Sequence, residues 1–306
     1  MKKLYLTALI AMTALVDVQA QQDPHYTQYM YNMNVINPAY AGSKENLSFG
    51  LLYRKQWVDI EDSPTTGTFF VHSPTGKNVG LGLSVISDKI GPVTENNVYG
   101  DFSYTLNLGG EHRLALGLKA GATFHKVGLY SDIYNTLPDA NDPAFAEDVS
   151  NTYFNIGSGF FYYTNKYYVA FSVPNMLKSK HLDFDGRKFG SEVSHYFLTG
   201  GYVFDLSENT KFKPSFMLKS AFKAPTSLDV SANMLFFDKF EIGATYRLDD
   251  SFGGMVNYAI TPNVRIGYAY DRIVSDLKVT TPASHEVMLL FDLNFPKKVS
   301  RSPRYF

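Results

Sequence analysis

The sequence has no cysteine, no surplus of either charge and no recognisable catalytic motif. Without cysteine, a disulfide framework, a thiolate metal site and lipoprotein export are all excluded. The 28 Lys and Arg residues balance 29 Asp and Glu residues, so no basic field points to nucleic acid or anionic lipid. HExxH, GxSxG and P-loop patterns are missing, and the seven histidines form no i,i+4 pair. We therefore expect no enzymatic activity, no cofactor and no metal site.

Long hydrophobic runs are also scarce, and the one clear example lies at the start of the chain. Two lysines precede an apolar stretch over residues 4–16, and the small residue Ala20 follows. The stretch is too short to cross a bilayer comfortably and ends at Asp17. Residues 1–20 are therefore predicted to be a secretory signal peptide that is cleaved after Ala20.

What the chain does contain is aromatic and apolar residues spread through polar ones. Hydrophobic residues make up 45% of the chain, with 22 Tyr and 24 Phe, yet the mean hydropathy is only −0.16. Tyr and Phe at this level favour strands. The apolar residues must therefore be dispersed by alternation.

The stretch HRLALGLKAGATFH, residues 112–125, shows this alternation directly. Leu114, Leu116 and Leu118 fall on one face, whereas Gly117 and Lys119 fall on the other. A period of two over about ten residues is typical of a strand with one apolar and one polar or small face. On this assignment Leu116→Arg is disfavoured in lipid and Gly117→Ser is tolerated in a polar lumen.

About fourteen such stretches follow one another, an even number within the range of single-chain outer-membrane β-barrels. The predicted strands are 46–58, 65–73, 78–88, 95–108, 112–127, 151–164, 166–174, 193–205, 211–222, 227–237, 239–247, 252–260, 264–272 and 284–295. The fold class is therefore all-β, a transmembrane barrel over residues 46–295 of antiparallel strands. A soluble all-β sandwich or propeller is the alternative, because those folds also alternate.

The connections between these strands alternate in length. Even-numbered connections such as GGE, TNK and TPN are turn-like, whereas several odd-numbered ones are long, above all residues 128–150, 175–192 and 272–283. Outer-membrane barrels have short periplasmic turns and longer extracellular loops. We therefore expect an outer-membrane protein with membrane lipid as its surroundings and both termini in the periplasm.

Charged residues on the polar faces are predicted to point into the lumen, where charge costs little. Their signs are mixed, which favours a paired interior network over an ion-selective pore. The predicted inward-facing charges are Arg54, Lys119, Lys213, Lys219, Arg247 and Arg265, with Asp101, Asp229, Glu241, Glu286 and Asp292.

Residues 21–45 form an N-terminal arm that contains the segment INPAYAG. Asp23 and Pro24 are suited to a helix start, and Pro38 stops any helix at Asn37. We expect a short helix or compact arm at the periplasmic mouth or inside the lumen, that is, a periplasmic or plug segment. An irregular ordered tail is the alternative.

Three segments resemble one known family: QQDPHYTQYMYNMNVINPAYAGS after the signal peptide, GLLYRKQWV, and the chain end SPRYF. They are similar to the PorP/SprF family of type IX secretion system outer-membrane proteins of Bacteroidota. The family motif covers Asn37, Pro38, Ala39, Tyr40, Ala41 and Gly42. The resemblance implies a non-enzymatic component that helps to secrete or retain a surface protein, such as a gliding adhesin, through that cargo's C-terminal domain. A passive channel for small solutes is the alternative function.

Two regions are candidate binding sites. The long loops carry aromatic and charged residues suited to protein contacts: Tyr130, Tyr134, Phe145, Phe184 and Arg187. A basic tail over residues 296–306 is predicted to lie in the periplasm and to dock onto other type IX secretion components through Arg301, Arg304, Tyr305 and Phe306. An acidic stretch at 139–148 is predicted to be a solvated loop, with weak Ca²⁺ binding as the other interpretation.

Overall fold

The computed structural model describes residues 25–44, 46–128, 148–177, 180–184, 187–191, 194–221, 224–274 and 283–293. Side chains are described for the same residues except 180–184, 187–191, 224 and 225. Within these ranges no helix is long and apolar enough to cross a membrane.

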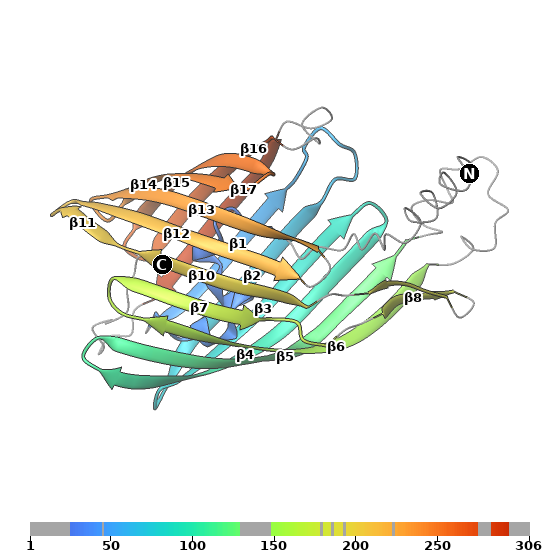
Figure 1. The fold of residues 1–306 in the computed structure, drawn as a ribbon, viewed down its shortest axis with the longest axis horizontal. Coiled ribbons are helices and arrows are strands. Elements are labelled where there is room, and N and C mark those ends of the chain that lie inside the picture. Colours follow the sequence, from blue (N-terminus) through green and yellow to red (C-terminus); the bar gives the residue numbers. More distant parts are fainter. Residues whose placement is uncertain are drawn as a thin grey trace, which may run out of the picture.

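The wall of the molecule is a closed antiparallel β-barrel (Figure 1). Its strands are β1 (Leu47–Lys55), β2 (Thr65–Gly76), β3 (Val79–Ile90), β4 (Val93–Gly109), β5 (His112–Val127), β6 (Val149–Tyr163), β7 (Tyr167–Val173), β10 (His195–Tyr202) with β11 (Phe204–Ser207), β12 (Thr210–Ala221), β13 (Ala224–Phe236), β14 (Phe240–Arg247), β15 (Ser251–Thr261), β16 (Val264–Ile273) and β17 (Ala283–Leu293). The barrel closes because β1 pairs with β17. Strands β10 and β11 form one staggered strand that is interrupted at Val203, so the wall has the fourteen strands predicted from the sequence.

The two ends of the barrel differ in their connections. At one end, here called the short-turn end, the strands are joined by tight turns such as Lys77–Asn78, where both residues have positive φ, as the favoured two-residue hairpin turns require. The other end is called the long-connection end. There, β8 (Lys180–Phe184) and β9 (Arg187–Ser191) form a separate hairpin that the sequence pattern did not predict.

Alternation along each strand separates an outer apolar face from an inner polar one. On β5, Leu116 is 48% exposed and Leu118 is 63% exposed, whereas Lys119, the next residue along the strand, is only 2% exposed. The same parity holds on β4, where Val98 and Phe102 face outward and Asp101 faces inward. An apolar belt on the outside and charge on the inside is the arrangement of a membrane barrel.

The wall is not level at the long-connection end. Strands β4, β5 and β6 have 17, 16 and 15 residues, whereas β7 has only seven. Figure 1 shows β5 and β6 projecting beyond their neighbours. The wall therefore drops abruptly between β6 and β7.

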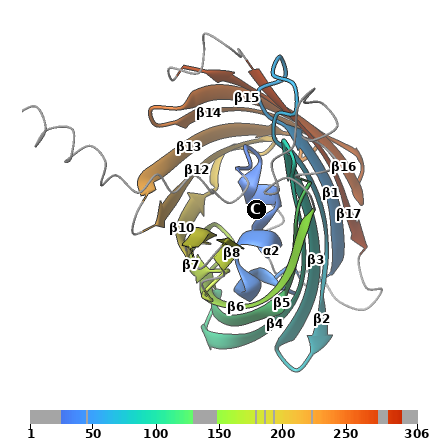
Figure 2. The same ribbon diagram turned by 90° about the vertical axis from the view of Figure 1, so that its right-hand side faces the viewer.

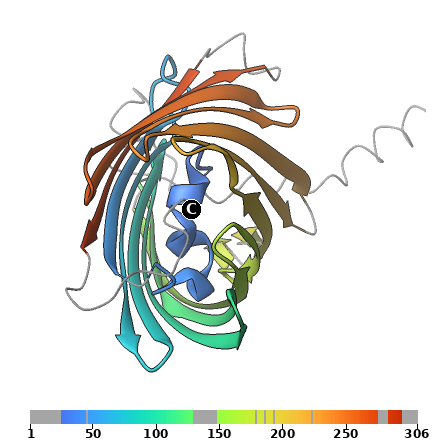
Figure 3. The same cartoon turned by 90° about the vertical axis from the view of Figure 1, so that its left-hand side faces the viewer.

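The lumen is filled by residues 25–44, called the plug below. It consists of the 3-10 turn η1 (Tyr29–Tyr31), the one-turn helix α2 (Met33–Ile36) and the 3-10 turn η2 (Pro38–Tyr40). Figures 2 and 3 show this blue segment inside the ring of strands, seen from both ends. Every residue of these three elements is buried. The plug and the inner wall together therefore form the core of the molecule.

Candidate functional site: the plugged lumen

Asn37 and Pro38 make the turn that stops the plug helix. Pro38 fixes φ at the first position of η2, and the Asn37 side chain accepts a hydrogen bond from the Ala39 N–H at 2.9 Å. The other end of the same amide donates to the main-chain oxygen of Phe160 on β6, also at 2.9 Å. Asn37 therefore closes the local turn and ties it to the barrel wall with one side chain.

Glycines of the barrel wall leave room for the main chain of the plug. A Cβ atom on Gly117 would lie 2.1 Å from the nitrogen of Ala39 and 2.5 Å from the carbonyl carbon of Pro38. A Cβ atom on Gly80 would lie 2.1 Å from the carbonyl oxygen of Ala41. The expectation that Gly117→Ser is tolerated is therefore wrong, because the lumen at this point holds protein main chain and not water.

Gly42 ends the motif in a conformation that other residues adopt with difficulty. Its φ is +73°, and a Cβ atom there would lie 2.8 Å from the Cα atom of Gly80. The carbonyl oxygen of Ala41 accepts a hydrogen bond of 2.6 Å from the Ser103 hydroxyl. Gly42 thus turns the chain out of the lumen toward β1 while the wall holds the residue before it.

Tyr40 provides the aromatic anchor of the motif. Its ring meets His72 and Phe161 edge to face, with centroid distances of 5.4 and 5.2 Å. Such pairs are worth about 0.5–1.5 kcal/mol beyond their buried area. Burial raises the pKa of the Tyr40 hydroxyl far above its ordinary value, so it stays neutral.

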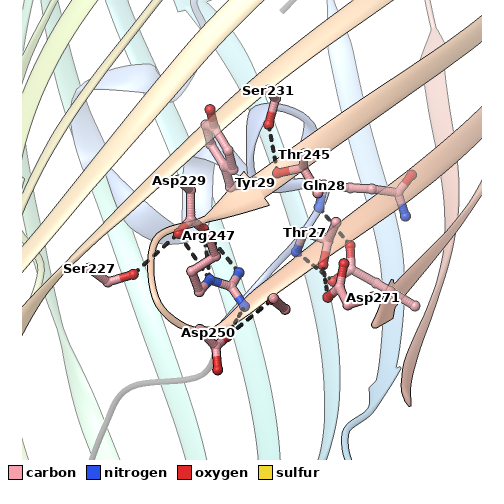
Figure 4. A network of polar contacts seen from close by, with 12 residues as sticks. Thr27, Gln28, Tyr29, Ser227, Asp229, Ser231, Thr245, Arg247, Asp250 and Asp271 are labelled. Carbon is pink, nitrogen blue, oxygen red and sulfur yellow. Dashed lines mark hydrogen bonds and ion pairs between the residues drawn. The ribbon is translucent and has the colours of Figure 1, made fainter. Parts of the chain in front are cut away.

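The first residues of the plug are held by a buried cluster of charges. Figure 4 shows Thr27 and Gln28 of the plug beside Asp271 of this cluster. The Glu286 carboxylate accepts the main-chain N–H groups of Thr27 and Gln28, each at 2.9 Å. Arg54 pairs with Asp271 at 2.8 Å and with Glu286 at 3.3 Å. Arg54 also donates to the Thr27 hydroxyl at 2.8 Å, which links all three charges to the plug.

A second cluster holds the middle of the plug. The Tyr31 hydroxyl donates to Glu241 at 2.6 Å, and the Lys213 ammonium lies 3.0 Å from the same carboxylate. Burial, with Glu241 nearby, raises the pKa of Tyr31 well above its ordinary value. The phenol therefore remains a hydrogen-bond donor to this carboxylate.

A third cluster holds α2 from the opposite wall. Lys119 pairs with Asp101 at 3.1 Å and donates to the main-chain oxygen of Val35 at 3.1 Å. Asn34 donates to the other oxygen of Asp101 at 3.2 Å. The Val35 carbonyl, near the C-terminal end of the one-turn helix, is thus met by a buried cation.

The predicted inward charges all lie on the lumen face, and the predicted paired network is confirmed. The sequence analysis did not predict that many of these ion pairs also form hydrogen bonds to the plug. It also missed Asp271, although Asp271 has the same parity on its strand as the inward-facing Arg265. This shared parity was the signal by which the sequence could have predicted an inward-facing Asp271.

The plug runs from one mouth of the barrel to the other. His25 and Tyr26 line a cavity of about 60 Å³ at the long-connection end, whereas Lys44 lines one of about 420 Å³ beside the turn at Asn263. The described chain thus begins at the long-connection end and finishes, at Leu293, at the short-turn end. The termini themselves lie outside the described residues, so the expectation that both face the periplasm stays a prediction.

The predicted binding residues of the loops and tail cannot be placed. Tyr130, Tyr134, Phe145 and the acidic stretch 139–148, except for Asp148, lie outside the described residues, as do Arg301, Arg304, Tyr305 and Phe306. The main chain at Phe184 and Arg187 belongs to the β8–β9 hairpin, where their two positions pair across its turn.

The geometry described here defines a class of protein. A closed fourteen-stranded barrel with an apolar outer belt, inward charge and no spanning helix among the described residues is a transmembrane β-barrel of the outer membrane. A family model described as "Type IX secretion system membrane protein PorP/SprF" matches residues 18–291. The chain belongs to the PorP/SprF family, as the sequence resemblance predicted.

Solved barrels of other kinds are similar in fold only. The outer membrane protein Omp33 of Acinetobacter baumannii is 12% identical, with 82% of this chain and 100% of that chain covered and a TM-score of 0.47. The monoaromatic hydrocarbon channel CymD is 11% identical, with coverages of 86% and 92% and a TM-score of 0.48. No curated protein gives a significant match. These similarities are too distant to bear on function.

Proposed function

We propose that this protein is a non-enzymatic component of the type IX secretion system that helps to export or retain one surface protein by binding its C-terminal domain at the long-connection mouth. The observation that carries this proposal is the plug. Residues 27–40 are buried and bonded to the barrel wall along the length of the lumen. A sealed barrel is better suited to holding a protein at its mouth than to passing solutes.

The same observation weighs against a passive channel. Seven or more contacts fix the plug, including charge-assisted hydrogen bonds that are each worth about 1.5–3 kcal/mol. Opening the lumen would require breaking several of them together. We therefore expect no stable conductance from the purified protein in planar bilayers, and channel openings of constant size would favour the channel instead.

The orientation follows the usual arrangement of outer-membrane barrels. Short turns face the periplasm and long connections face the cell exterior. The cargo would then meet residues 128–150, with Tyr130, Tyr134 and Phe145, together with the β8–β9 hairpin. The basic tail, with Arg301, Arg304, Tyr305 and Phe306, would meet periplasmic components of the secretion system.

The test is a deletion strain compared with the same strain complemented by the intact gene. Quantitative proteomics of the cell surface should show one or a few proteins lost from the surface and restored by complementation. A complementing variant in which residues 128–150 are replaced by a tight turn should insert normally yet restore less of that protein. An unchanged surface proteome in the deletion strain would refute the proposed function.

A further inference from the structure

The outer wall has a cavity of about 590 Å³ at the short-turn end, between the β11–β12 turn and the β13–β14 turn. In Figure 1 the tip of β11, at the left, marks this part of the barrel. The Phe237 N–H donates to the Asn209 oxygen at 2.8 Å, which joins the two turns. All the residues that line the cavity belong to the described part of the chain. The cavity is thus built from strands and turns that are bonded to one another.

Three aromatic rings on neighbouring strands form the floor of this cavity. Phe240 on β14 pairs across the sheet with Phe236 on β13 and with Tyr258 on β15. The rings of Phe236 and Phe240 stack with their centroids 6.4 Å apart. Leu235 and Glu241 are buried and face the lumen, so the next residues along the strands, Phe236 and Phe240, face outward.

The aromatic floor is continuous with the apolar belt of the wall. Ile242 and Val256, the next outward residues on β14 and β15, are cross-strand partners and are exposed. Leu206 and Ile260, close to the turns, are exposed apolar residues as well. The apolar outer surface therefore reaches the turns here, and the cavity lies on the surface that lipid covers.

Phe237, in the β13–β14 turn, has a backbone conformation that a phenylalanine rarely adopts. Its φ is +54° and that of Asp238 is +53°, values for which hairpin turns prefer Asn and Gly. The left-handed conformation costs a residue with a side chain roughly 1–2 kcal/mol. The Phe237 ring lines the cavity and is 67% exposed. A strained turn that holds an exposed ring at the membrane surface points to a ligand for that ring.

The two turns also supply one cation and one anion. Lys239 and Glu208 line the cavity, and neither forms an ion pair within the part of the chain that the structure describes. The third charged residue of the lining, Asp238, is already paired with Lys211 at 2.7 Å. The cavity thus offers one ammonium group and one carboxylate beside its aromatic floor.

We propose that this cavity binds one zwitterionic phospholipid whose headgroup carries a phosphate and a primary ammonium, as in phosphatidylethanolamine. Lys239 binds the phosphate, Glu208 accepts hydrogen bonds from the ammonium, and the acyl chains lie along Phe240 and Ile242. The occupant is a lipid because the floor continues the lipid-facing belt, and its headgroup charges complement those of the two turns. A quaternary ammonium, as in phosphatidylcholine, has no N–H for Glu208, so the site discriminates between the two lipids.

Native mass spectrometry of the full-length barrel in detergent, after removal of lipid, tests the site. Phosphatidylethanolamine should bind as one molecule per barrel and roughly threefold more tightly than phosphatidylcholine. Glu208→Gln should abolish this preference, and Lys239→Gln should weaken the binding of both lipids by roughly two- to fivefold. The matched control is Lys77→Gln, which removes an exposed lysine from the β2–β3 turn and should bind both lipids as the native barrel does.

Phe237→Asn separates lipid binding from folding. Asparagine suits the positive φ, so this variant should unfold at the same or a higher urea concentration, yet it should bind phosphatidylethanolamine roughly threefold more weakly because the ring is lost. Phosphatidylethanolamine binding that is unchanged by both Lys239→Gln and Phe237→Asn would overturn the site.

Equal affinities of the native barrel for the two lipids would overturn the assignment of the headgroup. A cavity that is filled by another part of the chain or by a second copy would leave the native barrel without selective lipid binding, which would also overturn the proposal. The inference does not depend on the proposed function, because loss or retention of a surface protein leaves these lipid affinities unchanged.

Discussion

Gly117→Ala should displace the plug from the barrel wall. The added Cβ atom would lie 2.1 Å from the Ala39 nitrogen, where ordinary contact begins at 3.4 Å, so the main chain of the plug has to move by about 1.3 Å. Such a shift breaks the bonds that hold this stretch: Asn37 to Phe160 at 2.9 Å and Ser103 to Ala41 at 2.6 Å. The Ser172 hydroxyl bond to the Ile36 oxygen, at 2.9 Å, is lost with them.

These losses can be summed roughly. Three hydrogen bonds at about 1 kcal/mol each and an overpacking cost of about 1–3 kcal/mol exceed the 0.4–1 kcal/mol that Gly→Ala gains from a less flexible unfolded chain. We expect a net loss of about 3–6 kcal/mol in the free energy of unfolding. The matched control is Gly100→Ala, whose Cβ atom would have only the Ala120 oxygen, at 3.9 Å, within 4 Å.

Urea unfolding of the two variants in the same lipid, followed by heat-dependent mobility on gels, measures the difference. Trypsin cleavage after Lys44, where the plug meets β1, reports plug displacement separately. Equal unfolding midpoints and equal protection of Lys44 in the Gly117 and Gly100 variants would refute the assignment of Gly117 as a seat for the plug.

Three further predictions follow from the wall and its charges. Leu116→Arg places a cation in lipid at mid-strand and should make insertion less favourable by about 2–4 kcal/mol. The refolding yield in vesicles, compared with that of Leu116→Ala, measures this loss; equal yields would contradict the outward facing of Leu116. Glu286→Gln removes the charge that accepts hydrogen bonds from two plug N–H groups and should weaken the binding of the plug to the wall by about 2–3 kcal/mol. Residues 25–44 should then be cleaved faster by protease; unchanged proteolysis would mean that Arg54 and Asp271 suffice to hold the plug. Cysteine placed at Lys188 should react with an impermeant thiol reagent on intact cells and cysteine at Asn263 should not; the reverse pattern would invert the orientation.

The barrel was readable from the sequence because a wall strand carries its own signal. A period of two depends on one strand and its two faces, so β5 was predicted with both of its ends correct, over 112–127. The split between β10 and β11 at Val203 left no trace in the pattern, since both pieces keep the alternation. The β8–β9 hairpin was missed because its strands of five residues are too short to show a period.

The content of the lumen was not readable in the same way. Small residues at inward positions, such as Gly80 and Gly117, are equally consistent with a wet lumen and with a seat for main chain. The turn at Asn37 and Pro38 was predicted, but its partner Phe160 lies 123 residues away on β6. Contacts of that kind depend on which strands the plug packs against. The periodicity of a single sequence carries no information about such pairings.

The position of the plug also has a consequence for assembly. Thr27 and Gln28 precede the whole barrel in the chain, yet their carboxylate partner, Glu286, lies on the last strand, more than 250 residues later. That strand is also the one that closes the ring against β1. Glu286 can therefore hold Thr27 and Gln28 only once β17 is in place, so the strand that closes the ring also supplies the carboxylate that anchors the plug.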